Sequence, residues 1–206
     1  KISAFDDMTL IQLVVERGTE AVDALPAGIR SNPEAVAETI ENNVRKVIID
    51  EQPINPRYYE KMSALLDTLI EQRKKEALEY QEYLQRIVEL TKRVADPGLG
   101  ETYPMTIDTP GKRALYDNLD QAEWMARAVH AAVLDSRQDD WRSNRFKVKQ
   151  VRNAIRAAVE MAVEGTGVGP ALAVSATART SADYGAESTE QLVERILTLV
   201  KKQREY

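Results

Sequence analysis

The chain has 206 residues, of which 43% are hydrophobic and 30% are charged, a composition ordinary for a globular protein with one sizeable core or two small ones. Its formal net charge of −5 argues against a strongly basic nucleic-acid-binding domain, although it leaves room for a local basic patch. The absence of cysteine excludes disulfides and thiolate metal sites and is consistent with a reducing cytoplasm.

Helical periodicity dominates the first half of the chain, where apolar residues recur every three or four positions. Aromatic residues are few (6%) while Glu, Lys, Arg, Ala and Leu are plentiful, a mixture that favours helix over sheet. Two segments begin with Asn-Pro, at Asn32 and Asn55, and this pair is typical of a helix N-cap followed by the first helical residue. We therefore predict helices over residues 6–25, 33–52, 56–75 and 78–94.

The second half begins with PGLGETYPMTID, residues 97–108, which we predict to be a linker because Asp-Pro-Gly stops the preceding helix. Residues 164–187 are rich in Gly, Ala, Ser and Thr and are expected to form a flexible insertion. Helices are predicted near residues 109–119, 121–137, 145–163 and 188–204. The sequence thus predicts an all-α multi-helix bundle, in which helical subdomains 1–96 and 109–206 pack together.

The sequence shows no sign of a membrane segment or a leader. No stretch approaches the roughly 20 consecutive apolar residues that a membrane-spanning helix needs. The start, KISAFDDMTL, has neither a basic leader nor an apolar core, so we expect no secretory signal. Because the chain begins with Lys rather than Met, we expect it to be part of a longer protein.

The sequence also contains little from which a catalytic site could form. His130 is the only histidine, and one histidine alone cannot supply a catalytic triad or a metal site, so we expect a helix-surface or semi-buried residue. The adjacent carboxylates at 6–7 and 139–140 would point in different directions on a helix. The glycines within 165–169 follow no predicted strand, and Gly111-Lys112 lacks the flanking residues of a phosphate-binding loop. We predict no catalytic residue, metal ligand or cofactor in this chain.

Residues 139–156, DDWRSNRFKVKQVRNAIR, form a markedly basic stretch in a mildly acidic chain. On a helix at 100° per residue, four of its cations fall within about 60° of arc, and an apolar stripe lies beside them. The cations are Arg145, Lys149, Arg152 and Arg156, and the apolar residues are Val148, Val151, Ile155 and Val159. Aligned cations repel one another by a few tenths of a kcal/mol per pair, which favours a partner, internal or external, that supplies negative charge.

This cationic stripe has three interpretations, namely a solvated helix face, a contact with DNA phosphates, or a docking face for an acidic protein surface. Lys112 and Arg113 would extend the stripe if their helix packs nearby. The candidate contact residues are therefore Arg142, Arg145, Lys149, Arg152, Arg156, Lys112 and Arg113.

Several ordered segments, taken together, carry a family resemblance. They are FDDMTLIQLVVERG, the long run from AVAETIENNVRKV to YLQRIVELTKRV, YPMTIDTPGKRALYDNL, DDWRSNRFKVKQVRNAI and the closing ILTLVKKQREY. This chain resembles the C-terminal helical region of the restriction subunit of type I restriction-modification enzymes over residues 5–160 and about 190–206. It departs from the family pattern at residues 161–187, which are longer and richer in Gly and Ala.

The resemblance implies a non-catalytic part of an ATP-dependent deoxyribonuclease. In that family the restriction subunit combines a nuclease domain, two helicase-like motor domains that translocate double-stranded DNA, and this helical tail. ATP and Mg²⁺ would belong to the motor and nuclease domains. The implied partners are the methyltransferase and specificity subunits, the motor domains of the same chain and the DNA backbone, in a bacterial or archaeal cytoplasm. The alternative is a sequence-independent DNA-contacting module that uses the basic helix 145–156.

Overall fold

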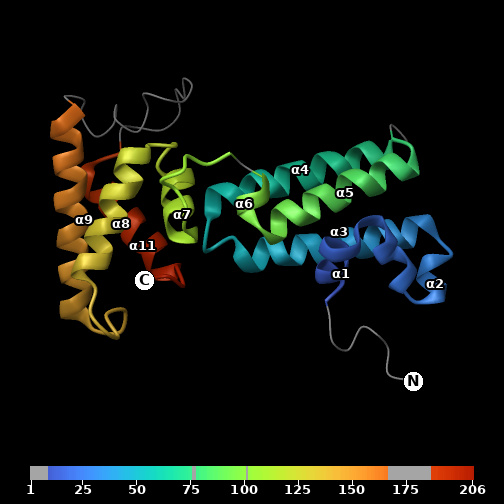
Figure 1. The fold of residues 1–206 in the computed structure, drawn as a ribbon, viewed down its shortest axis with the longest axis horizontal. Helices are drawn as coiled ribbons and strands as arrows, with labels where there is room; N and C mark the ends of the chain where they lie inside the picture. Colours follow the sequence, from blue (N-terminus) through green and yellow to red (C-terminus); the bar gives the residue numbers. More distant parts are fainter. Residues whose placement is uncertain (1–8, 76–77, 101, 167–186) are drawn as a thin grey trace. The chain divides into compact units, whose positions relative to one another are not determined.

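The computed structural model describes residues 9–75, 78–100, 102–166 and 187–206 (Figure 1). Every regular element in these ranges is a helix, which confirms the predicted all-α fold. The chain divides into two compact units, unit 1 from Lys1–Gln52 and Pro56–Thr102 and unit 2 from Pro53–Asn55 and Tyr103–Tyr206. None of the described helices is long and apolar enough to cross a membrane.

Unit 1 follows the predicted helices, with one break. Its elements are α1 (Leu10–Arg17), the 3₁₀ helix η1 (Gly18–Ala24), α2 (Ala27–Arg30), α3 (Pro33–Glu51), α4 (Pro56–Lys74), α5 (Tyr80–Ala95) and α6 (Pro97–Gly100). Gly18 ends α1 at a positive φ of 60°, a conformation that glycine adopts easily, so the predicted helix over 6–25 is interrupted. Asn32 caps α3 as predicted, because its side chain accepts a hydrogen bond from the Glu34 N–H at 3.0 Å.

The core of unit 1 lies where α1, α3, α4 and α5 meet. Each helix buries one apolar face at helical spacing, as the sequence pattern predicts. Its largest fully buried side chains are Ile40, Met62, Leu66, Tyr83 and Ile87.

A charged network joins three helices of unit 1. Glu41 of α3 is only 6% exposed, and its carboxylate accepts hydrogen bonds from Arg73 of α4 at 2.8 and 3.1 Å. The Tyr83 hydroxyl of α5 donates to the same carboxylate at 2.8 Å. Because a buried charge without a partner is strongly destabilising, this network favours one arrangement of α3, α4 and α5.

Unit 2 contains α7 (Pro110–Asn118), α8 (Glu123–Ser136), α9 (Arg145–Thr166) and α11 (Thr189–Lys202). α9 packs against α8 and α11, while α7 packs against α8 and α11. The core between them includes Leu115, Met125, Val151, Ile155 and Ile196. α9 runs three residues into the predicted insertion 164–187, whose residues 167–186 lie outside the described part of the chain.

The segment predicted as a linker, 97–108, is divided between the units. Its first residues form α6, whereas Ile107 is 1% exposed within the core of unit 2. The Tyr103 hydroxyl donates a hydrogen bond to Asp117 at 2.9 Å. Asn55 belongs to unit 2 as well, because its side-chain amide hydrogen-bonds Asp117 and Asn118 of α7 at 2.7 and 2.8 Å.

Candidate functional site

The predicted cationic stripe lies on α9, which begins directly after Asn144. The Asn144 side chain accepts hydrogen bonds from the backbone N–H groups of Phe146 and Lys147 at 2.9 and 3.3 Å, and so caps the helix. The buried face of α9 carries Val151, Ile155 and Val159, as predicted. The stripe is therefore placed beside a packing face, and its four cations meet different surroundings.

Two of the four cations are neutralised inside unit 2. Arg152 pairs with Glu194 of α11, with Nε 2.7 Å from Oε1, and Arg156 forms an ion pair and hydrogen bond with Glu190 of the same helix. The negative charge that the stripe needs at these positions comes from the chain itself. Both pairs are part of the packing of α9 on α11.

Arg142 also has an internal role. Its Nε donates to the Lys201 carbonyl at 3.0 Å, and a terminal nitrogen donates to the Gln203 carbonyl at 2.6 Å. The last carbonyls of a helix have no partner within it, so Arg142 stabilises the end of α11. Its guanidinium also lies 5.2 Å from the ring of Trp141, which is 2% exposed.

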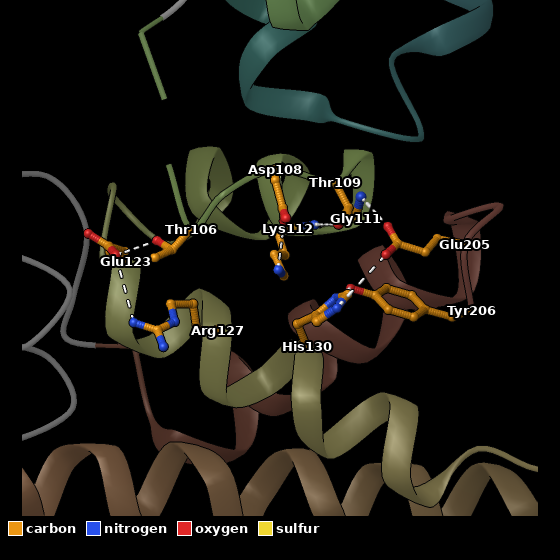
Figure 2. Close-up of polar contacts among 10 residues, drawn as sticks. All are labelled: Thr106, Asp108, Thr109, Gly111, Lys112, Glu123, Arg127, His130, Glu205 and Tyr206. Carbon is orange, nitrogen blue, oxygen red and sulfur yellow. Dashed lines mark hydrogen bonds and ion pairs between the residues drawn. The ribbon is translucent and has the colours of Figure 1, made fainter. Parts of the chain in front are cut away.

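The two predicted cations of α7 have partners close to them in the chain. Lys112 Nζ pairs with Asp108 Oδ1 at 2.7 Å, as Figure 2 shows. The Arg113 guanidinium lies 5.5 Å from the centroid of the Tyr103 ring. Both contacts are local to α7 and the segment before it. They give Lys112 and Arg113 structural roles within unit 2.

Arg145 and Lys149 differ from the other candidates, because both are exposed and neither forms an ion pair or hydrogen bond with another described residue. Phe146, next to them, leaves 76% of its side chain in water, and the Arg145 guanidinium lies 6.0 Å from its ring centroid. The neighbouring Lys147 donates to the Asp139 carbonyl at 2.7 Å. We call Arg145, Phe146, Lys147 and Lys149 the α9 patch.

The α9 patch borders a surface hollow of about 420 Å³. Phe146 and the two lysines form part of its lining, and four carboxamide side chains complete it. These are Gln138, Asn144, Gln150 and Asn153. A surface with cations, amides and one exposed ring, and without a lining carboxylate, suits an anionic group that arrives with an apolar neighbour.

Phe146 was not among the residues singled out from the sequence, although the sequence contains the signal. It is nine positions from Ile155, which at 100° per residue is about 180° around the helix. Ile155 belongs to the apolar face that the periodicity identifies. A large aromatic residue opposite the apolar face of an amphipathic helix is therefore expected to expose its ring to solvent.

Unit 2 contains a second polar cluster, formed where the end of the chain meets α7 and α8 (Figure 2). Glu205 Oε2 accepts a hydrogen bond from the Gly111 N–H at the start of α7, at 2.7 Å, and Arg137 donates to the Glu205 carbonyl at 2.6 Å. Tyr206 is 4% exposed, and its hydroxyl lies 2.7 Å from His130 Nδ1. This cluster fixes the closing residues onto the unit.

His130 is more buried than predicted, at 8% exposure. Burial lowers the pKa of His130, and the Glu205 carboxylate opposes that shift. Burial raises the pKa of the Tyr206 hydroxyl, so the phenol stays protonated and shares a hydrogen bond with Nδ1 of the imidazole. The only histidine of the chain thus has a structural hydrogen bond.

Gly111 explains the Gly-Lys pair that resembles part of a phosphate-binding loop. A Cβ at this position would lie 2.5 Å from Glu205 Oε2 and 2.9 Å from Tyr206 Cζ. The helix start is occupied by the chain's own carboxylate, and glycine leaves room for it. Within the described residues, no group of three or more His, Asp or Glu side chains is placed to hold a metal ion.

Comparisons with protein-family models, with characterised proteins and with solved structures found no match to this chain.

Proposed function

We propose that this chain is a non-catalytic helical assembly module of the restriction subunit of a type I restriction-modification enzyme. Its role is to attach the motor subunit to the methyltransferase–specificity core. Support comes from the ordered segments over residues 5–160 and 190–206 that resemble that subunit. The observation that carries the proposal is the α9 patch, where an exposed ring lies beside two cations without an ion-pair partner among the described residues.

Two residues of the patch, Arg145 and Phe146, are of types that protein interfaces favour. Aromatic residues and arginine are enriched at the centres of interfaces, where a few such residues supply most of the binding energy. The ion pairs of Arg152 and Arg156 with α11 hold the helix that presents the patch. A rigid helix loses little conformational freedom when it binds.

The assembly role is tested by mixing the purified chain with a purified core of methyltransferase and specificity subunits from the same organism. Sedimentation velocity at micromolar concentrations should show a complex heavier than either component. Circular dichroism on the same sample checks that the chain is folded. Two separate boundaries from a folded chain would contradict the assembly role.

Arg145 and Lys149, which have no ion-pair partner in the part of the chain that the structure describes, also favour a second candidate, a contact with the DNA backbone. Such binding would ignore base sequence and weaken with salt, and two phosphate contacts predict a slope of about −2 in log K against log salt concentration. Arg152 and Arg156 already form ion pairs with α11, so two of the four cations of the stripe are left for contacts with DNA. Fluorescence anisotropy with a labelled duplex tests it, and no binding at about 50 mM salt would rule it out.

A further inference from the structure

We infer that the α9 patch binds an acidic helix of a partner protein, with two carboxylates four residues apart facing Arg145 and Lys149 and an apolar residue covering Phe146. The inference rests on the assembly role proposed above for the identity of the partner. It goes further by naming the surface and the chemistry that fits it.

Further along α9, two similar cations already have partners within the chain. Arg152 and Arg156 are four residues apart on α9, and they pair with Glu194 and Glu190, which are four residues apart on α11. Between the two cations, Ile155 is fully buried. One face of α9 therefore places two cations and a buried apolar residue against an antiparallel helix that presents two glutamates four residues apart.

The start of α9 also carries two cations four residues apart with an apolar residue nearby. On the helix, however, Phe146 lies on the opposite side of its cation pair from Ile155. Arg145 and Lys149 are again four residues apart, and Phe146 lies next to Arg145. Continuing the antiparallel register brings the basic end of α11, Lys201 and Lys202, toward this part of α9. The Arg142 bond to the Lys201 carbonyl places the end of α11 there. α11 therefore supplies no acid for these two cations.

The start of α9 has an excess of positive charge. The N-terminus of a helix carries a partial positive charge, and α9 has no acidic residue in its first turn. Arg145 and Lys147 add two cations there, and Arg145 and Lys149 repel each other across one turn. Carboxylates from a partner would offset the helix dipole and this repulsion together.

The geometry of the patch favours an acidic protein over duplex DNA as its partner. Arg145 and Lys149 are one helical turn, about 6 Å, apart, so they cover two phosphates at most. A phosphate backbone offers nothing apolar to the Phe146 ring, which is 76% exposed. A helix that carries both carboxylates and an apolar side chain satisfies the whole patch.

The test compares the affinity of variants for the methyltransferase–specificity core. The double variant Arg145→Glu/Lys149→Glu and the single variant Phe146→Ala should each raise the Kd about tenfold or more. An acidic residue at position 145 suits the first turn of α9, and Lys149 is exposed, so the double variant should unfold at about the same temperature as wild type. A loss of binding then cannot result from unfolding.

Matched controls come from exposed residues of unit 1. Lys46→Glu/Lys74→Glu makes the same change in net charge, and Ile49→Ala removes a side chain that is 61% exposed. Both should leave the Kd within about twofold of wild type. If wild type binds the core and the patch variants bind equally well, the inference is overturned and the assembly role stands.

A wild-type chain that does not bind the core contradicts the assembly role, and a second measurement then decides on the patch. The probe is a synthetic helical peptide with two glutamates four residues apart and a leucine between them, followed by amide NMR of the chain. Saturable shifts confined to residues 145–153 support the inference. The absence of shifts would overturn it. Shifts of the same amides caused by a 20-base-pair duplex, when the peptide causes none, would overturn it as well.

Discussion

Gly111 occupies the second position of α7, where alanine would be the better helix former by about 1 kcal/mol. Glycine fits here because it has no Cβ, which would lie 2.5 Å from Glu205 Oε2 and 2.9 Å from Tyr206 Cζ. The Glu205 carboxylate can swing aside, but the buried Tyr206 ring cannot. The tertiary contact therefore outweighs the helix propensity.

We expect Gly111→Ala to lower the free energy of unfolding by about 1–3 kcal/mol, the usual cost of overpacking. Urea denaturation followed by far-ultraviolet circular dichroism, which reports the helices of both units, measures it. Gly28→Ala is the matched control, because nothing lies within 4 Å of a Cβ at that position, and it should be neutral or stabilising by up to about 1 kcal/mol. A Gly111→Ala chain as stable as wild type would show that Glu205 and Tyr206 are not docked there.

His130 makes stability depend on pH in a known direction. Burial lowers its pKa from the ordinary 6.5, so below that pH the unfolded chain binds more protons than the folded chain. Stability should be fully present above about pH 6.5 and should fall as the pH decreases, with a slope of at most about 1.4 kcal/mol per pH unit. Chemical denaturation between about pH 7.5 and 5 measures it.

The control for this effect is His130→Gln, which cannot be protonated and whose carbonyl oxygen can accept the Tyr206 hydrogen bond. Because His130 is the only histidine, the variant should lose most of the slope in this range. Asp108 does not interfere, because its hydrogen bond to Lys112 lowers its pKa. Equal slopes in the two proteins would mean that another group is responsible.

At the scale of elements, the positions of the helices could be predicted from the sequence, whereas their contacts could not. Apolar periodicity and the Asn32–Pro33 start locate α3 because these signals are local to the helix. The pairing of Arg152 with Glu194 joins residues 42 positions apart, and no local pattern reports which helices meet. The stripe was therefore visible in the sequence, whereas its partial neutralisation by α11 was not.

The Glu41 network should matter more to stability than any ion pair on the surface. Glu41→Ala leaves the Arg73 guanidinium, whose side chain is 10% exposed, with the 64% exposed Glu34 as its ion-pair partner, and we expect a loss of about 2–4 kcal/mol. Tyr83→Phe removes one hydrogen bond to a charged group and should cost about 1.5–3 kcal/mol. Guanidinium denaturation followed by circular dichroism gives both values.

The matched comparison is the exposed pair of Arg45 and Asp67, whose side chains are 37% and 61% exposed. Asp67→Ala should cost less than about 1 kcal/mol, because exposed pairs are screened by water. If Glu41→Ala costs no more than Asp67→Ala, the network does not hold α3, α4 and α5 together.

At the scale of the whole molecule, the division into two units has its origin in two separate apolar cores. One core draws its buried residues from 10–94 and the other from 107–206. Composition and turn signals locate a break near 97–108, but they do not reveal that Pro53–Asn55 belongs to unit 2. That assignment depends on the bonds of Asn55 to α7, which join residues more than 60 positions apart.

The two cores can be followed separately, because both tryptophans of the chain, Trp124 and Trp141, lie in unit 2. Tryptophan fluorescence reports that unit alone, whereas far-ultraviolet circular dichroism reports the helices of both. Leu66→Ala, in the core of unit 1, should cost that unit about 2–5 kcal/mol. The early part of the dichroism transition should move to lower urea while the fluorescence midpoint stays unchanged.

Ile155→Ala is the corresponding core variant in unit 2, where Ile155 is fully buried. It should shift the fluorescence midpoint to lower urea by an amount that corresponds to about 2–5 kcal/mol. If Leu66→Ala moves the fluorescence midpoint as far as it moves the dichroism transition, the units unfold as one cooperative system. Unchanged fluorescence would mean that unit 2, which carries the α9 patch, keeps its fold when unit 1 is weakened, and that the patch can be studied without unit 1.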